Sequence, residues 1–262
     1  MRRRARGRAG AAASVVLVVL AAACSGGGGP AGVPTTVPAS QTGPGPLYIS
    51  VGASETTGIG SEVPLREAWP RVLYRTAMPA NTVFVNMGIP GATVALALQF
   101  EVPRTVDQKP NIVTVWLNVN DIIAGVSAAD FERDLGNLVR QLRRGGQTRV
   151  LVANTPPIDH LPAYKACRPD PPAAGPECRA PNGVLPAPDD VNRLIDDYNA
   201  ATARVAEREG ANLVDLHAVG MKSRAAGIED ALVSPDGFHP NAGGYQLVAT
   251  AFAEVLQKSG PL

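Results

Sequence analysis

The sequence has almost no net charge: 24 Lys and Arg residues face 23 Asp and Glu residues, for a formal charge of +1 over 262 residues. Five of the arginines stand within residues 1–8. A chain without a basic excess has no charged face to hold a nucleic acid, so we expect no nucleic-acid partner. The composition, 45% hydrophobic and 18% charged, is that of one globular catalytic domain rather than a disordered chain.

The sequence also lacks an apolar run long enough to span a bilayer comfortably. The apolar stretch AGAAASVVLVVLAAAC, residues 9–24, is short and follows the arginines directly. Charged residues followed by a short apolar run are typical of a secretory signal. The pattern predicts a signal peptide over residues 1–23 and an exported protein.

Cysteine and histidine are scarce, with three residues of each. Cys167 and Cys178 lie close together in a proline-rich segment, and in an oxidising compartment such a pair normally closes. We therefore predict a disulfide between them. No Cys/His quartet accompanies them, and His160 and His217 have no matching carboxylate spacing, so we expect no metal and no cofactor.

The end of the apolar run, VLAAAC, resembles the lipobox of bacterial lipoproteins. The resemblance implies a diacylated Cys24 as the new N-terminus and an anchor on the outer face of the cytoplasmic membrane. It departs from the lipobox at Ala21, where leucine is usual, and the alternative is a secretory signal cut nearby with Cys24 incidental. In residues 25–46, 12 of 22 positions are Gly or Pro, which indicates a tether between Cys24 and a domain over residues 47–262.

Beyond the tether, short β-branched apolar runs alternate with segments of helical spacing. The runs are nearly continuous, as in buried parallel strands. They cover residues 47–52, 82–88, 111–119, 149–156 and 211–218. Helices are predicted in residues 129–146, with Asp130 as a candidate cap, in 189–210 and in 241–260.

This alternation predicts an α/β domain with a parallel sheet covered on both faces. Ligand sites in such sheets lie beyond the C-terminal ends of the strands, where the strand order switches. No repeat appears along the chain. The one irregular piece is the proline-rich insert, residues 157–188, and a loop of that length in a compact domain is usually functional.

Residues that suit ester hydrolysis follow three consecutive predicted strands, and two more stand near the C-terminus. Ser54 follows the first run, Gly91 lies after the second, and Asn120 follows the third; Asp236 and His239 stand three residues apart. A serine nucleophile needs a base, a group that orients the base, and donors that face the oxyanion. Alone, each residue has a simpler role in a turn, a cap or a surface pair, but together they indicate chemistry.

This set resembles the SGNH hydrolases, the GDSL family of lipases and esterases, over residues 47–258. The family's four blocks occur in order as Gly52-Ala53-Ser54-Glu55, GIPGAT around Gly91, Asn118-Val119-Asn120-Asp121, and Asp236 to His239. The resemblance implies a three-layer α/β/α fold with a five-stranded parallel sheet, flavodoxin-like and doubly wound. It also implies an ester substrate and an acyl-serine intermediate.

Residue by residue, the resemblance makes Ser54 the nucleophile, His239 the base and Asp236 the group that orients it. The backbone N–H groups of Ser54 and Gly91 and the amide of Asn120 would form the oxyanion hole.

Three positions depart from the family's pattern. Ala53 replaces an aspartate that commonly braces the serine loop, Glu55 replaces a leucine, and Asn118 replaces a glycine. None of these changes removes a reacting group, so they bear on rate and substrate range.

Two alternatives keep the fold: a wall- or lipid-binding lipoprotein without catalysis, and an acyltransferase to a sugar or alcohol. The absence of a G-x-S-x-G elbow argues against an α/β-hydrolase. We expect His160 to be a loop residue of the insert without contact to substrate, and His217 to end a strand.

Overall fold

The computed structural model describes residues 45–179 and 185–260. Its centre is a five-stranded parallel sheet in the order β2-β1-β3-β4-β5. The strands are β1 (Leu47–Gly52), β2 (Val83–Asn86), β3 (Ile112–Trp116), β4 (Arg149–Ala153) and β5 (Asn212–Val214). This is the flavodoxin-like, doubly wound order that the resemblance implied.

Strands β2 to β5 are shorter than the apolar runs that predicted them, and helix caps end the runs that became β3 and β5. The side chain of Asn118 accepts a hydrogen bond from the N–H of Val119, where α6 (Val119–Ile123) begins. Asp215 in the same way accepts from Ala218 N in the first turn of α10 (Leu216–Ala225). Both caps follow a strand directly and turn the chain out of the sheet, which sets the sheet edge where the site lies.

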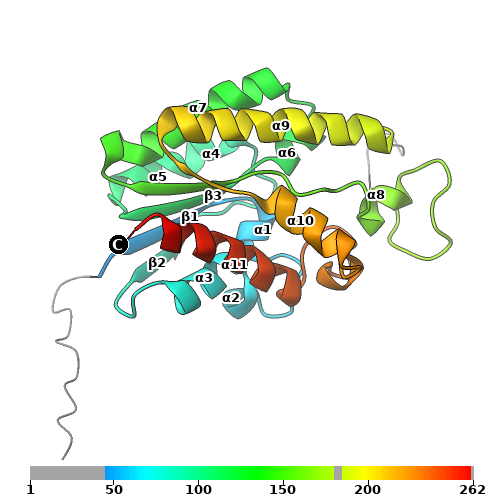
Figure 1. Ribbon diagram of the computed structural model, residues 1–262, viewed down its shortest axis with the longest axis horizontal. Coiled ribbons are helices and arrows are strands. Elements are labelled where there is room, and N and C mark those ends of the chain that lie inside the picture. Colours follow the sequence, from blue (N-terminus) through cyan, green and yellow to red (C-terminus); the bar gives the residue numbers. More distant parts are fainter. Residues whose placement is uncertain (1–44, 180–184, 261–262) are drawn as a thin grey trace, which may run out of the picture. The chain divides into compact units, whose positions relative to one another are not determined.

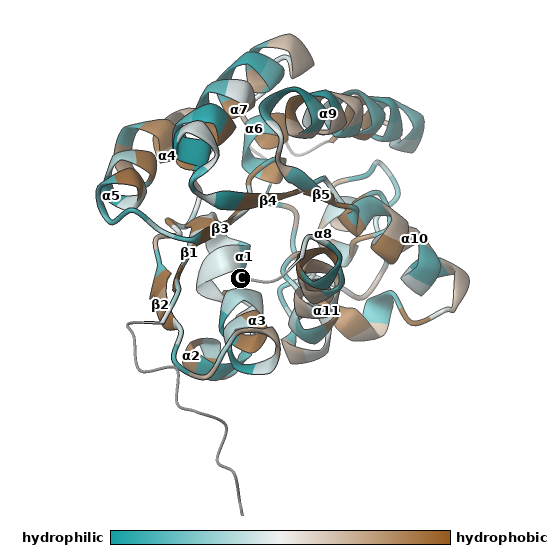
Figure 2. Ribbon diagram, turned by 60° about the vertical axis from the view of Figure 1, so that its left-hand side comes forward, coloured by the Kyte–Doolittle hydropathy of each residue, from teal (hydrophilic) through white to brown (hydrophobic). Residues whose placement is uncertain are grey.

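One face of the sheet is covered by a layer of helices (Figure 1). Among them are α4 (Val94–Phe100), α5 (Val102–Asp107), α7 (Ala128–Arg143) and α9 (Pro188–Glu209). Phe131 of α7 and Tyr198 of α9 stack at 4.2 Å between ring centroids, both fully buried. The outward faces of α7 and α9 are polar, so the apolar side of each helix is its sheet side (Figure 2).

The ends of α7 differ in detail from the expected ones. Ser127, not Asp130, caps the helix, because its Oγ accepts from the backbone N–H of Asp130 at 3.1 Å. The helix ends at Arg143, and Arg144 takes the left-handed conformation before a short 3₁₀ turn, Arg144–Gly146. The prediction of Asp130 as the cap was therefore wrong, because the cap is Ser127, three residues earlier.

The opposite face is covered by α2 (Pro64–Glu67), α3 (Trp69–Ala77) and α11 (Ala242–Lys258) (Figure 1). Trp69 of α3 and Phe252 of α11 stack at 4.3 Å between ring centroids and are fully buried. The sheet therefore lies between two apolar layers, and the three-layer α/β/α arrangement is confirmed.

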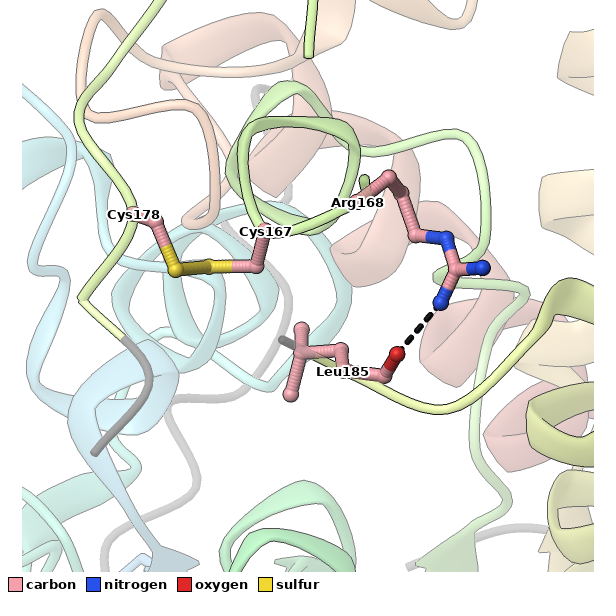
Figure 3. The surroundings of a disulfide bond; sticks show 4 residues. All are labelled: Cys167, Arg168, Cys178 and Leu185. Carbon is pink, nitrogen blue, oxygen red and sulfur yellow. Dashed lines mark hydrogen bonds between the residues drawn. A yellow bond between two sulfur atoms is a disulfide. The ribbon is translucent and has the colours of Figure 1, made fainter. Parts of the chain in front are cut away.

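The insert contains the predicted disulfide. Cys167 and Cys178 are bonded, with their Cα atoms 4.8 Å apart (Figure 3). Cys167 ends the short helix α8 (Pro162–Ala166), and the next residue, Arg168, donates to the carbonyl oxygen of Leu185. Ala163 N donates to the carbonyl of Gly237 at 3.0 Å, so the insert is fastened to the loop that carries Asp236 and His239.

The predicted signal peptide, Cys24 and most of the predicted tether lie outside the described residues. Among the residues that the structure does describe, no helix is both long and apolar enough to cross a membrane.

Candidate active site

The candidate site lies at the C-terminal edge of the sheet, beyond β1 and β3, where the strand order switches. Ser54 is the first residue of α1 (Ser54–Thr57), directly after β1. Gly52 is required at the end of that strand, since a Cβ there would lie 2.1 Å from Thr56 Oγ1. The tight junction turns Ser54 out at the strand end with its side chain almost buried, 7% exposed.

Ser54, His239 and Asp236 form a continuous hydrogen-bonded series. The Oγ of Ser54 lies 2.9 Å from Nε2 of His239, and Nδ1 of His239 lies 2.6 Å from Oδ2 of Asp236. Ser54 and His239 are 185 residues apart in sequence, so only the fold brings them together. The arrangement is the one in which a serine hydroxyl can pass its proton to a neutral imidazole.

Asp236 is held as a carboxylate by the turn in which it stands. Partial burial raises its pKa, but hydrogen bonds from His239, Phe238 N–H and Ser234 outweigh that effect and lower the pKa to about 2. Three of these donors converge on Oδ1: Ser234 Oγ at 2.7 Å, Phe238 N at 2.8 Å and His239 N at 2.9 Å. Oδ2 is thereby left to face the imidazole.

The glycine and asparagine blocks are tied to each other. The side-chain amide of Asn120 donates to the carbonyl of Ala92 at 3.0 Å, and both carboxylate oxygens of Asp121 accept from Val94 N at 3.1 Å. Gly91, next to Ala92, has a φ of +80°, and a Cβ on it would meet no atom within 4 Å. Only glycine takes this conformation readily, and its open side leaves room for a ligand to approach the backbone.

A carboxyl group braces the serine loop even though Ala53 has none. Glu101, from the junction of α4 and α5, accepts a hydrogen bond from the N–H of Gly52 at 2.9 Å. This residue was not predicted from the sequence. Its signal was a single charged residue in the otherwise uncharged stretch from Ile89 to Pro103. Glu101 thus supplies from another element the brace that position 53 lacks.

Glu101 is expected to make the protein less stable as the pH rises. Burial raises its pKa to about 8 from the usual 4.5, against the opposing hydrogen bonds from Gly52 and Ile89 N–H. A raised pKa in the folded state gives stability that is complete below pH 4.5 and is lost as the pH rises through 8. The loss has a slope of up to about 1.4 kcal/mol per pH unit.

Glu101→Gln keeps an acceptor for Gly52 and cannot ionise. We therefore expect the free energy of unfolding of Glu101→Gln, relative to wild type, to increase from pH 6 to pH 8, measured by urea denaturation. Asp121, whose pKa burial raises to about 6, contributes equally to both proteins and cancels. A difference that stays constant over this range would contradict an ionisable brace.

Glu55, where the family has leucine, lies against the nucleophile. Its Oε2 is 3.2 Å from Ser54 Oγ, and its side chain is buried, 7% exposed. Burial is the main influence on its pKa and raises it, while its own backbone N–H and the nearby His239 act in the opposite direction.

The two other histidines stand apart from this group. Nδ1 of His160 lies 3.3 Å from Glu229, at the surface, as expected for a loop residue of the insert. His217 lies in the first turn of α10, not at the end of a strand, with Nδ1 3.2 Å from the carbonyl of Thr155. The strand predicted over residues 211–218 ends in the structure at Val214, so His217 was wrongly assigned to a strand. Across residues 45–179 and 185–260 no cluster of three His, Cys, Asp or Glu residues could hold a metal ion.

Comparison with known proteins identifies the family. The sequence profile of the GDSL-like lipase/acylhydrolase family matches residues 50–247, most of the chain. The protein therefore belongs to this family, and the predicted enzyme class, a carboxylic ester hydrolase, is confirmed. No curated protein sequence matches the chain.

Solved structures share the fold at low sequence identity. A GDSL-like lipase from Parabacteroides merdae is 14% identical, with a TM-score of 0.61 over 81% of this chain and 96% of that one. An acetyl-xylooligosaccharide esterase from Geobacillus is 20% identical, with a TM-score of 0.60 over 82% and 95%. The esterase EstA from Pseudoalteromonas, solved with monoethylphosphonate, is 17% identical, with a TM-score of 0.57 over 82% and 98%.

Proposed function

We propose that the protein is an exported serine esterase that hydrolyses carboxylic esters through an acyl group on Ser54. The observation that carries the proposal is the series from Ser54 Oγ to His239 Nε2, at 2.9 Å, and from His239 Nδ1 to Asp236 Oδ2, at 2.6 Å. These are hydrogen-bond distances for a nucleophile, its base and the group that orients the base.

In the first half of the reaction, Ser54 Oγ attacks the ester carbonyl carbon while His239 Nε2 takes the hydroxyl proton. Asp236, a carboxylate with a pKa of about 2, stabilises the imidazolium that forms. The bond from carbonyl carbon to alcohol oxygen then breaks, and the proton on Nε2 passes to the departing oxygen. The acyl group is left on Ser54 and the alcohol is free.

In the second half, a water molecule gives its proton to His239 Nε2 and attacks the acyl carbon. The bond from that carbon to Ser54 Oγ breaks, and Oγ recovers the proton, so that an acid is released and the serine is restored. The same residues would serve transfer to an alcohol acceptor, and an ester panel with and without added alcohols distinguishes hydrolysis from transfer.

The negative oxygen of both tetrahedral intermediates would be met by three donors: the N–H groups of Ser54 and Gly91 and the side-chain amide of Asn120. Asn120 gives one amide hydrogen to Ala92, at 3.0 Å, and this bond fixes the amide with its second hydrogen available. Among the described residues, no protein acceptor takes the N–H of Ser54 or Gly91. Hydrogen-bond donors that are fixed in this way stabilise the negative charge that develops on the carbonyl oxygen in the transition state.

Esterase activity is expected to fall as the medium becomes acidic. A protonated imidazole cannot accept the Ser54 proton, and histidine side chains generally change charge between pH 5 and pH 8. Asp236, with its pKa of about 2, stays ionised over the whole range and does not contribute. A profile of kcat/KM for p-nitrophenyl butyrate from pH 5 to pH 8 measures this, and a flat profile would argue against His239 as the base.

The location of the enzyme is part of the proposal. The charged N-terminus, the short apolar run and Cys24 suggest export and an N-terminal lipid anchor. We expect wild-type protein expressed in its host to sediment with membranes and Cys24→Ala protein to be found in the soluble exported fraction or unprocessed. Wild-type protein that is found wholly in the culture medium would support a plain secretory signal instead.

A further inference from the structure

An apolar pocket lies beside the nucleophile. Its volume is about 860 Å³ with its open mouth included. The wall combines the β4 loop and insert with α10, α11 and the turn around His239. Its apolar members include Trp116, Val119, Ile158, Leu161, Leu216 and Phe238. An apolar pocket beside the nucleophile suits the organic part of an ester.

Four polar side chains stand in this pocket, and two of them have partners in the protein. Ser223 Oγ donates to the carbonyl of Val219 at 3.1 Å, and the carboxylate of Glu229 accepts from Arg224 at 3.0 Å. The other two are Glu55 and Asn118. These two are also positions where the chain departs from its family's pattern, so both departures change one pocket.

Glu55 loses its side-chain donor, the Ser54 hydroxyl, whenever Ser54 is ready to react. Ser54 has one hydroxyl proton and two acceptors in reach, Nε2 of His239 at 2.9 Å and Oε2 of Glu55 at 3.2 Å. In the reactive arrangement the proton points at His239, so no side-chain donor is left for Glu55. The carboxyl of Glu55, a residue that is 7% exposed in an apolar wall, is then open to a donor from the substrate.

Asn118 contributes to the wall but not a free donor. Its Oδ1 accepts from Val119 N at 2.7 Å, and its Nδ2 is enclosed without a hydrogen-bond partner among the described residues. Because Nδ2 has almost no accessible surface, the group that this pocket offers to a substrate donor is the carboxylate of Glu55.

We propose that this pocket recognises a hydroxyl group on the substrate, which donates to Glu55. The proposal rests on the proposed function, since it deepens the specificity of the same site. Glu55 is the specificity-determining residue in it, whereas the family's leucine would offer an apolar wall.

The contact with Glu55 limits how far the hydroxyl can stand from the ester. A hydroxyl at hydrogen-bond distance from Oε2 lies within about 6 Å of Ser54 Oγ. The attacked carbonyl carbon lies about 3–3.5 Å from that oxygen. The hydroxyl is therefore no more than about 9.5 Å from the carbonyl carbon, either on the acyl chain or on the alcohol.

Two matched pairs of esters test the proposal and distinguish the two sources of the hydroxyl. The acyl pair is p-nitrophenyl 3-hydroxybutyrate against p-nitrophenyl butyrate, and the alcohol pair is 2-hydroxyethyl butyrate against propyl butyrate. Wild-type enzyme is expected to prefer the hydroxylated member of one pair by about 10-fold or more in kcat/KM, because the other member leaves the buried carboxyl of Glu55 unpaired. The pair that shows the preference tells which half of the ester enters the pocket.

Two variants assign the preference to Glu55. Glu55→Leu is expected to reverse it in favour of the alkyl ester, since a buried hydroxyl then has no acceptor. Glu55→Gln, which keeps an acceptor oxygen and the shape, is expected to retain part of it. Ser223→Ala, a polar pocket residue already paired, is the matched control and should keep the wild-type ratio.

The preference is the ratio of kcat/KM for the two esters of a pair, both measured on the same enzyme. A loss of activity that affects both esters equally therefore cancels. Wild-type enzyme that hydrolyses the esters of both pairs equally well, or a Glu55→Leu enzyme that keeps the preference, would overturn the hydroxyl site while leaving the esterase intact. No turnover of either p-nitrophenyl ester by folded wild-type protein would instead count against the proposed function itself.

Discussion

Replacing Ser54 with alanine is expected to lower kcat for p-nitrophenyl butyrate by about 10⁶-fold, the scale on which removal of a serine nucleophile acts. The hydroxyl is the atom that bonds to the acyl carbon, and the neighbouring side chains do not replace it. Initial rates with purified protein measure the loss, and circular dichroism with thermal unfolding checks that the variant is folded.

Ser61→Ala is the matched control for this substitution. Ser61 follows seven residues later, and its Oγ donates to the carbonyl of Gly58 at 2.9 Å. It should leave kcat near the wild-type value. A folded Ser54→Ala enzyme with more than about a tenth of wild-type activity would exclude an acyl-serine route.

Asp236→Asn is expected to lower kcat by about 10⁴-fold, because it imposes the wrong histidine tautomer. Three donors converge on Oδ1 of Asp236, so the amide oxygen of asparagine should take that place. Its NH₂ group then faces Nδ1 of His239, which must act as an acceptor. The proton of the neutral ring is left on Nε2, where it blocks transfer from Ser54.

The effect of Asp236→Asn should depend on Ser54. Residues that act as one unit are not additive, so the double variant Ser54→Ala/Asp236→Asn should be no slower than Ser54→Ala alone. Asp230→Asn, an exposed acid six residues upstream, controls for the loss of a negative charge in the same region. An Asp236→Asn enzyme within a few-fold of wild type would mean that Asp236 only shapes its turn.

The fold was predictable because the buried parallel strands of an α/β sheet leave strong local patterns. The run over residues 47–52 became β1 unchanged, and both layers follow from the spacing of apolar residues in the helices. Strand ends were less predictable. Asn118 and Asp215 cap helices inside runs that read as continuous strand, and apolar periodicity does not report such a cap.

The site was predictable where it follows the order of motifs and unpredictable where it depends on tertiary contact. Ser54, Asp236 and His239 were named from sequence and lie in one hydrogen-bonded series. Glu101 was missed, because a lone charged residue in an uncharged stretch does not indicate which loop, 49 residues away, it braces. Glu55 and Asn118 were recognised as departures, but only the structure places both in one pocket.

The most direct test of the central claim, that Ser54 is the nucleophile, is covalent labelling of folded wild-type protein with a fluorophosphonate. We predict one adduct per chain by intact-protein mass spectrometry, located on Ser54 by peptide mapping and lost in Ser54→Ala. Labelling that goes to another residue, or no labelling of folded and ester-hydrolysing protein, would contradict the account.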